Sequence, residues 1–283
     1  MNKVAIIGIG LIGGSLAKGI RRIYPKAAIY GYDRQKKHLD EAIKLGLVDQ
    51  GGTSQDLCEV DLVVLSIPVD AMIEQLPKVL HEVNENCLVV DAGSTKMAIC
   101  KSVEQHHKRR NFLACHPIAG TEFSGPSAAF DGLYDGKTNI ICEVEKTAFK
   151  LQEKALELFR ELGMRIRYMN PEAHDKHIAY VSHLSHISSF MLGKTVIEEE
   201  QNERDIFDMA GSGFESTVRL AKSSPQMWTP IFEQNKTNVI KSLEEYIKNL
   251  EGFKKLLQQH DFEGVYAEMD NTNRIKQILE GIP

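Results

Sequence analysis

The first 168 residues alternate short apolar runs with segments of helical apolar spacing. Because the runs are continuously apolar, they are typical of parallel strands that are covered on both faces. Repetition of strand, helix and strand predicts a doubly wound α/β domain. The expected strands are residues 3–7, 27–32, 61–66, 87–90, 112–115, 138–142 and 165–168. The expected helices are 11–23, 69–82, 96–109 and 147–162.

The pattern changes after Asn170-Pro171, where long helical patterns replace the strands. These patterns carry more apolar surface than a single amphipathic helix needs, and such helices often pack against a second copy of the chain. The pattern therefore predicts an α/β domain over 1–168 and an all-helical domain over 169–283, a length that fits two domains. The expected helices are 177–197, 205–221 and 230–257.

Composition and charge argue against several classes of partner. The net charge is −5 at pH 7, so no global basic field favours nucleic acid or anionic lipid. The basic cluster Lys108-Arg109-Arg110 follows a helical pattern, and we interpret it as the solvated end of a helix. No apolar run is long enough to span a membrane, and the N-terminus lacks a secretory pattern. We therefore expect a cytoplasmic protein that binds neither nucleic acid nor membrane.

The cysteines and histidines do not form a metal-site pattern. The five cysteines are scattered without a CxxC pair, which argues against disulfides and a thiolate site. His174 and His177 lie three residues apart, as do His183 and His186, so each pair can share a helix face. No HExxH motif accompanies them, and we predict no metal. We interpret them as a polar pocket wall, with ordinary buried helix histidines as the alternative.

The first expected strand runs into GIGLIG at residues 8–13, a GxGxxG pattern. The pattern stands between a strand and a helix, which is the context that a dinucleotide-binding Rossmann domain requires. Gly8 permits the tight turn, Gly10 lets the backbone approach a pyrophosphate, and Gly13 lets the helix pack close to the sheet. The free N–H groups and dipole of that helix favour the phosphates. The alternative is a glycine turn in an α/β protein that binds no nucleotide.

An acid follows the second expected strand, about 20 residues beyond the last glycine. A carboxylate at Asp33 accepts hydrogen bonds from a ribose 2′-OH and repels a 2′-phosphate, which favours NAD over NADP. Arg34 weakens this preference for NAD, because its side chain can stack on adenine or bind a 2′-phosphate. Ser66 and Pro68 close the third strand at the edge where open α/β sheets bind ligands, although Pro68 can also simply start a helix. The expected cofactor contacts are Gly8, Gly10, Leu11, Ile12, Gly13, Asp33, Arg34, Ser66 and Pro68.

Two further residues follow strands at that same edge. Ser94 comes after the fourth expected strand, where it can act as an active-site hydroxyl or cap the next helix. His116 comes after the fifth, where a neutral imidazole can accept a proton from a substrate hydroxyl while hydride leaves the same carbon. The alternative for His116 is that it starts a turn before Pro117. Arg219, on an expected helix, can bind a substrate carboxylate or form a surface ion pair.

Five segments in order resemble the prephenate dehydrogenase family of tyrosine biosynthesis. They are GIGLIGGSLA from residue 8, DAGSTK at 91–96, HPIAGTEFSGP at 116–126, VSHLSH at 181–186 and STVRLAKSSPQMW at 216–228. The resemblance implies NAD-dependent oxidative decarboxylation of prephenate to 4-hydroxyphenylpyruvate and CO₂. It implies His116 as the acceptor for the ring hydroxyl, and Ser94 as a group that bonds to that hydroxyl or to His116. Substrate contacts implied in the same way are Arg219, Thr121, Glu122, Ser182 and His186.

The resemblance also implies a homodimer formed by the helical domain, with Trp228 where that domain meets its partner. Two residues depart from the family pattern. Glu215 stands where relatives carry a basic residue, which bears on the charge of the pocket. Ser185 stands where proline is frequent, which bears on the start of a helix. Since neither a fused chorismate mutase nor a regulatory domain fits in the chain, we expect a monofunctional enzyme.

Three other functions fit parts of the sequence. One is an arogenate dehydrogenase, or an enzyme that takes both arogenate and prephenate. Arogenate carries an amino group in place of the keto group of prephenate, and Glu122 or Glu215 can favour that ammonium. The 3-hydroxyacid dehydrogenases have the same two-domain plan, and the resemblance to them implies a catalytic lysine. Lys194 is the candidate for that lysine. A nucleotide-sensing protein would bind NAD without turnover. The sequence leaves the substrate preference, tyrosine inhibition and strictness of NAD over NADP open.

Overall fold

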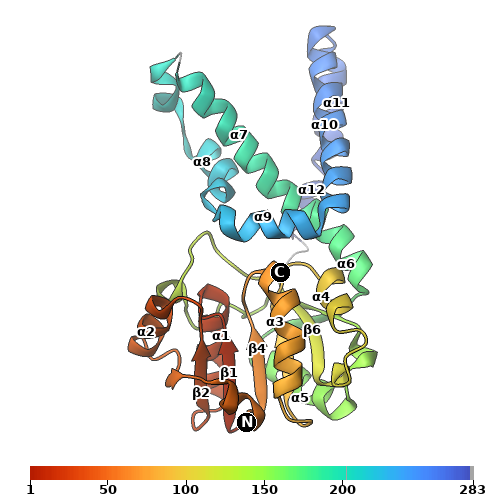
Figure 1. Cartoon of the computed structure of the whole chain (residues 1–283). Helices are drawn as coiled ribbons and strands as arrows, with labels where there is room; N and C mark the ends of the chain where they lie inside the picture. The colour runs from red at the N-terminus through yellow and green to blue at the C-terminus, as the bar shows by residue number, and fades with distance from the viewer. Residues whose placement is uncertain (202, 281–283) are drawn as a thin grey trace. The chain divides into compact units, whose positions relative to one another are not determined.

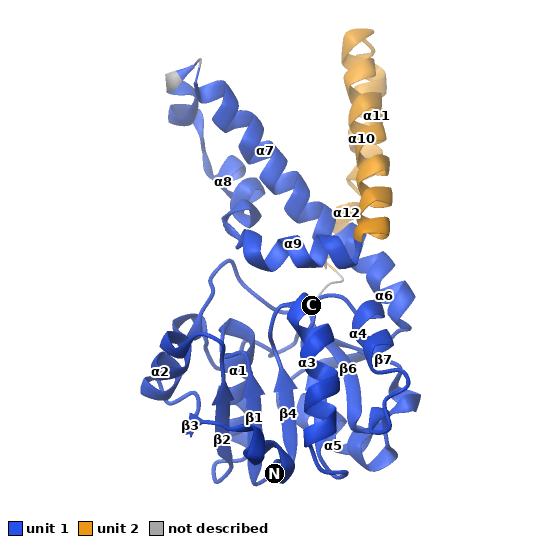
Figure 2. Cartoon of the chain, in the orientation of Figure 1, with its two compact units in different colours: residues 1–235 blue, residues 236–283 orange. Residues whose placement is uncertain are grey.

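The computed structural model describes residues 1–201 and 203–280. The chain divides into two compact units, Met1–Asn235 and Lys236–Pro283, which Figure 2 shows in different colours. The first unit holds the sheet and the helices up to Asn235. The second holds helices that follow it in the chain. The functional boundary expected after residue 168 stays a prediction.

One mostly parallel sheet forms the centre of the first unit (Figure 1). Its order among the described residues is β3-β2-β1-β4-β5-β6-β7-β8. The order reverses between β1 and β4, which creates the switch point where such sheets bind ligands beyond their carboxyl ends. The strands are β1 (Lys3–Ile7), β2 (Ala28–Tyr32), β3 (Gln50–Gly51), β4 (Leu62–Leu65), β5 (Leu88–Asp91), β6 (Phe112–Pro117), β7 (Thr138–Cys142) and β8 (Arg165–Tyr168).

Helices cover both faces of this sheet, which explains why its strands are continuously apolar. Val4 and Ile6 of β1 belong to one core with side chains of α1, α2 and α5, while Ala5 belongs to the other core with side chains of α3 and α4. The predicted doubly wound fold is therefore confirmed. The helices are α1 (Leu11–Ile23), α2 (Lys36–Lys44), α3 (Val69–Glu82), α4 (Met97–Ser102) and α5 (Phe149–Glu161). Short 3₁₀ turns are η1 (Ser54–Glu59), η2 (Arg109–Asn111), η3 (Pro126–Ala128) and η4 (Val144–Lys146).

The basic cluster after α4 differs from its prediction. The helix expected over 96–109 ends at Ser102, and Arg109 lies in the turn η2. Arg109 is buried, with Nη2 2.9 Å from Glu143 Oε2 and its guanidinium over the Phe112 ring. The interpretation as a solvated helix end is wrong for Arg109, because a long-range carboxylate and an aromatic face draw it inward.

Every regular element after β8 in the described part of the chain is a helix, as the sequence predicts. Two expected helices are interrupted: 205–221 breaks near Gly211, which caps α8, and 230–257 breaks at Asn235. The first unit contains α6 (Pro171–Ile178), the π-helical segment η5 (Ala179–His183), α7 (Leu184–Glu200), η6 (Arg204–Met209), α8 (Ser212–Val218), η7 (Arg219–Lys222) and α9 (Pro225–Gln234). The second contains α10 (Lys236–Gln258), α11 (Phe262–Thr272) and α12 (Ile275–Glu280).

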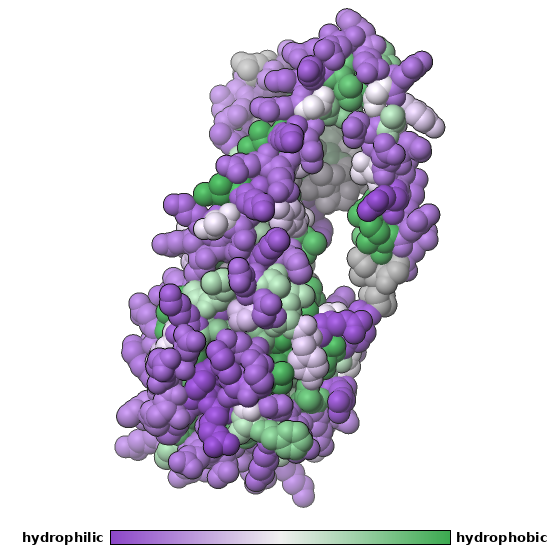
Figure 3. Space-filling model, turned by 90° about the vertical axis from the view of Figure 1, so that its right-hand side faces the viewer, coloured by the Kyte–Doolittle hydropathy of each residue, from purple (hydrophilic) through white to green (hydrophobic). Residues whose placement is uncertain are grey.

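Large apolar side chains remain exposed on the helices of both units. Met191 and Ile197 of α7 are exposed, as are Leu250 and Leu257 of α10. Figure 3 shows apolar side chains interrupting the hydrophilic surface of the chain. A further copy of the chain can cover such faces, as the sequence predicts. Within the described residues no helix has the length and apolar character that crossing a membrane requires.

Candidate active site

His116 lies inside β6, one residue before its end, rather than after it as the sequence predicts. The strand continues because β6 pairs with the antiparallel strand β7, which places His116 opposite Ile140. The ring is buried, and its Nδ1 lies 2.8 Å from Nε2 of His174. A histidine held by a strand ladder and by a second ring is a fixed group at the carboxyl edge of the sheet. The alternative that it merely starts a turn is wrong.

Asp175 connects this histidine pair to the loop after β5. His174 Nδ1 lies 2.7 Å from Asp175 Oδ1, and the carboxylate also accepts the N–H groups of Lys96 at 2.7 Å and Met97 at 2.9 Å. Asp175 therefore caps α4 from a distant part of the chain, a role usually played by a local side chain. Ser94 does not cap this helix, so the capping alternative for Ser94 is wrong.

A buried ion pair ties the ends of β5 and β6 together. The Lys96 side chain is fully buried, contacts the Asp91 carboxylate and donates from Nζ to the Cys115 carbonyl at 2.6 Å. Asp91 Oδ1 also accepts the Cys115 N–H at 2.8 Å. Buried charges persist where a partner and hydrogen bonds satisfy them. The pair thus holds the Ser94 loop and the His116 strand at one edge of the sheet.

Burial sets the charge state of the histidines. It lowers the pKa of His116 well below 6.5, and the His174, Lys96 and His183 charges lower it further. Burial also lowers the pKa of His174, although Asp175 opposes the shift, and lowers that of His183 to about 4. The low-dielectric surroundings disfavour the charged form. His116 is therefore neutral near pH 7 and can accept a proton.

The glycine loop has the geometry that its sequence predicts. Gly8 has φ +90°, and a Cβ there would lie 2.5 Å from the Ser66 carbonyl oxygen. A Cβ on Gly13 would lie 2.1 Å from the Gly8 carbonyl oxygen, whereas one on Gly10 would meet no atom within 4 Å. Gly10 is the N-cap of α1, whose first turn contains no acidic side chain. The open space above Gly10 at a helix N-terminus fits a pyrophosphate.

The acidic residue after β2 lies beside this loop. Asp33 Oδ2 accepts the Ile9 N–H at 3.1 Å, and Oδ1 accepts the Gln35 N–H at 2.9 Å. These bonds hold a carboxylate next to the glycine turn, where a ribose hydroxyl would be bound. Arg34 is exposed. Pro68 directly precedes α3, as its structural alternative predicts.

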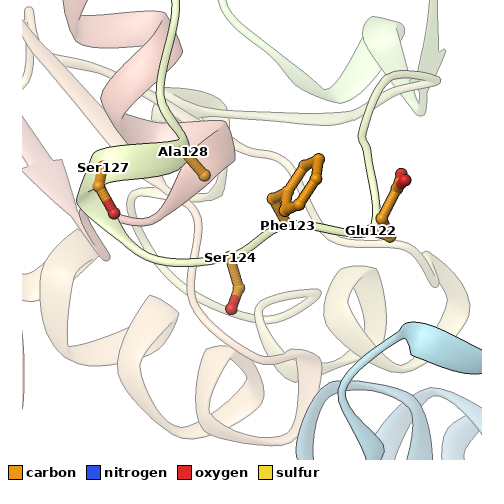
Figure 4. A pocket seen from close by; sticks show the side chains of 5 residues that line it. All are labelled: Glu122, Phe123, Ser124, Ser127 and Ala128. Carbon is orange, nitrogen blue, oxygen red and sulfur yellow. The ribbon is translucent and has the colours of Figure 1, made fainter.

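The substrate side of the site brings together residues far apart in sequence. Arg219 Nη1 lies 3.2 Å from Glu122 Oε2, although the two residues are 97 positions apart in the sequence. The Thr121 hydroxyl accepts the Phe123 N–H at 3.3 Å and shapes the same loop. An open hollow of about 520 Å³ lies beside this loop, and Figure 4 shows the side chains that line it. Its lining residues are Glu122, Phe123, Ser124, Ser127 and Ala128.

Trp228 packs against His186 of α7, one of the substrate contacts that the resemblance implies. His186 stacks on Trp228 with ring centroids 3.5 Å apart, and its Nδ1 lies 3.0 Å from the Ser182 carbonyl oxygen. Trp228 is buried, also packing on His183 and Phe232. Its ring is buried within one chain, and the expectation that Trp228 lies where the helical domain meets its partner stays a prediction. A polar pocket wall formed by these histidines stays a prediction.

Two other residues from the sequence, Lys194 and Glu215, lie outside this histidine group. Lys194 is exposed and pairs with Glu198 at 3.3 Å, which gives it no role near His116. Glu215 is exposed, 3.7 Å from Lys222 Nζ. Asp175 and Lys96, which the sequence reasoning did not select, belong to the group. The only local signal for them is their position beside His174 and within DAGSTK.

The fold and the site define a dehydrogenase with a dinucleotide-binding α/β domain. Family models described as the nucleotide-binding domain and the dimerization domain of prephenate dehydrogenase match residues 16–168 and 170–271. The chain belongs to the prephenate dehydrogenase family. The glycine loop precedes the first matched range, so its interpretation as a cofactor loop depends on the geometry described above.

Known proteins similar to the chain include three whose names bear on its substrate. The crystal structure of Aquifex aeolicus prephenate dehydrogenase in complex with hydroxyphenyl propionate and NAD⁺ has 35% sequence identity, a TM-score of 0.90, and coverage of 99% of this chain and 98% of that chain. Synechocystis arogenate dehydrogenase has 26% identity and a TM-score of 0.79, with coverage of 98% and 99%. The cyclohexadienyl dehydrogenase of Zymomonas mobilis is 28% identical, with coverage of 98% and 96%.

Proposed function

We propose that the chain is an NAD-dependent prephenate dehydrogenase, which converts prephenate to 4-hydroxyphenylpyruvate and CO₂. The single observation that carries the proposal is His116, which is buried in β6 at the carboxyl edge of the sheet, with its Nδ1 2.8 Å from His174 Nε2 and a pKa that burial lowers well below 6.5. Family membership supports the reaction, and the similar Aquifex structure, bound to NAD⁺ and a hydroxyphenyl compound, supports the cofactor.

The glycine loop and Asp33 would hold NAD, which supplies a hydride acceptor when bound. His116 Nε2 accepts the proton of the ring hydroxyl while hydride leaves the same carbon. The ring carboxylate then leaves as CO₂, and its bonding electrons make the ring aromatic. The ring oxygen, now a phenolate, takes a proton back. Because aromatisation drives the reaction, the protein mainly aligns the reacting atoms and holds the proton.

Arg219 is proposed to bind a carboxylate of the dianionic substrate. Its guanidinium is half exposed and already pairs with one carboxylate, that of Glu122. A planar fork suits a second carboxylate, so substrate binding can exchange or share this partner. Ser94, Thr121, Ser182 and His186 are proposed to complete the pocket around the ring. The second carboxylate of the substrate leaves as CO₂ and needs no permanent cation.

Replacing Arg219 with glutamine is expected to raise the KM for prephenate about 10- to 100-fold, because charge-assisted hydrogen bonds contribute about 1.5–3 kcal/mol. The kcat should change less, since the hydride and proton positions are untouched. Steady-state kinetics of purified variants measure both constants. Lys222→Gln, at the other end of the same turn, is the matched control and should leave KM unchanged. A lower kcat with unchanged KM in Arg219→Gln would refute substrate anchoring.

The alternative substrate is arogenate, and the position of Glu122 favours considering it. Its carboxylate lies on the hollow and can pair with an ammonium when Arg219 moves to the substrate carboxylate. Comparison of kcat/KM for prephenate and arogenate, each with NAD and with NADP, tests the proposal. We expect prephenate with NAD to give the highest value. A strong preference for arogenate would overturn the prephenate assignment, and a preference for NADP would overturn the role of Asp33.

We also propose that the helical segments pair with a second copy of the chain. The match of residues 170–271 to a dimerization domain supports this, together with the exposed apolar side chains of α7 and α10. Sedimentation of the purified protein measures the oligomer directly. Localisation in the cytoplasm remains an expectation from the sequence.

A further inference from the structure

The hydrogen bonds around His116 have a defined direction. Both carboxylate oxygens of Asp175 already accept backbone N–H groups, Oδ1 from Lys96 and Oδ2 from Met97, so Nδ1 of His174 donates to Oδ1. A neutral imidazole then has a bare Nε2, so His174 accepts at that nitrogen, and Nδ1 of His116 must be its donor. Neutrality follows from burial, which lowers the pKa of both rings. The consequence is that His116 carries its proton on Nδ1 and has a bare lone pair on Nε2.

The bare nitrogen is the one that is left for a ligand. Nε2 of His116 has no hydrogen-bond partner among the described residues, and it is not among their fully buried unsatisfied atoms. A proton acceptor needs an unprotonated nitrogen within reach of the substrate hydroxyl. The reverse tautomer would present an N–H to that hydroxyl and could not accept its proton. The direction of the His116–His174 and His174–Asp175 hydrogen bonds therefore determines whether His116 can accept the substrate proton.

Asp175 also fixes the second group at this edge. Its carboxylate accepts the backbone N–H groups of Lys96 and Met97, which directly follow Ser94-Thr95. Asn235, the residue after α9, donates to the Asp175 carbonyl oxygen at 2.6 Å and anchors the same residue. One carboxylate thus holds both the loop that carries Ser94 and, through His174, the ring of His116.

We propose that His174 and Asp175 are positioning residues that hold His116 in the tautomer with a bare Nε2 and fix the end of the loop that carries Ser94. This inference rests on the proposed function for its effect on turnover. The tautomer itself can be observed without substrate. Outer partners of functional histidines fix ring orientation and tautomer in this way, and their loss typically lowers activity about 10–100-fold.

A first test measures the tautomer in the wild-type protein by ¹⁵N NMR of histidine-labelled chain near pH 7.5. The shift of each ring nitrogen reports whether it carries a proton, and His116→Asn assigns the His116 signals by their loss. We expect an unprotonated Nε2 and a protonated Nδ1 on His116. A proton on Nε2 would overturn the proposal. Because no substrate is present, this outcome is independent of whether prephenate is oxidised.

A second test compares His174→Gln with His174→Leu. The glutamine amide can accept from His116 with its oxygen and donate to Asp175 with its nitrogen, whereas leucine can do neither. We expect kcat to fall about 10–100-fold in His174→Leu and less than about tenfold in His174→Gln, with KM for prephenate and NAD little changed. His177→Leu, an exposed histidine on the same helix, is the matched control.

Equal activity of the glutamine and leucine variants would overturn the proposal, because a packing role would not distinguish them by hydrogen bonding. A KM effect without a kcat effect would do the same. Thermal unfolding will show whether His174→Leu folds. If it does not, the tautomer measured in the wild-type protein and the kcat of His174→Gln test the proposal. A chain with the expected tautomer but no prephenate oxidation would overturn the proposed function and support the hydrogen-bond direction inferred here.

Discussion

His116→Asn is expected to lower turnover about 10²–10⁴-fold, the usual span for loss of a general base. The asparagine side chain is polar and of similar size, so it can keep a hydrogen bond to His174. It cannot accept the substrate proton at the position of Nε2. Because His116 is proposed to act on the substrate hydroxyl and lies outside the cofactor loop, the affinity for NAD should be largely retained.

Single-turnover NADH formation with saturating prephenate measures this loss, and fluorescence titration measures NAD affinity. His177→Asn serves as the control, since His177 is exposed on α6. We expect the control to turn over at the wild-type rate. A full-rate His116→Asn enzyme would refute His116 as the proton acceptor.

A pair of glycine substitutions should separate cofactor binding from folding. Gly10→Ala is expected to fold normally yet lose about 10–100-fold in NAD affinity, because its methyl group enters the space proposed for the pyrophosphate. A Cβ on Gly10 meets no protein atom within 4 Å, and the backbone there has φ −89°, which alanine readily adopts. The added methyl group therefore affects the ligand rather than the fold.

Gly13→Ala should show the opposite behaviour. Its Cβ would lie 2.1 Å from the Gly8 carbonyl oxygen, a backbone atom that cannot move freely. Overpacking of this kind costs about 1–3 kcal/mol or more, equivalent to roughly 2–4 °C in Tm for each kcal/mol. Thermal unfolding and NAD titration of both variants test the pair. Unchanged NAD affinity in Gly10→Ala would contradict the proposed pyrophosphate position.

The sequence predicted the α/β fold closely because burial on both faces leaves continuous apolar runs. The expected bounds of β1, β7, β8 and α1 agree with the structure. Strand β3 was missed because two residues, Gln50–Gly51, are too short to leave a pattern. The antiparallel direction of β7 was also not predicted, because an apolar run carries no information on strand direction. The breaks at Ser102 and Asn235 were missed because helical spacing continues past them.

The candidate site was predictable where it depends on strand ends. His116, Ser94 and the glycine loop follow apolar runs, and parallel topology brings such ends to one edge. Asp175 was not predictable, because its two backbone partners lie almost 80 residues earlier in the chain. The Arg219–Glu122 pair joins residues 97 positions apart. Contacts of this kind arise from packing, which spacing along one chain does not encode.

The most direct measurement of the central claim is product analysis of the purified chain with prephenate and NAD. We expect NADH and 4-hydroxyphenylpyruvate to form in equal amounts, and the formation of both to fall together in His116→Asn. NAD binding without any prephenate-dependent NADH formation would contradict the account and would favour a nucleotide-sensing protein instead.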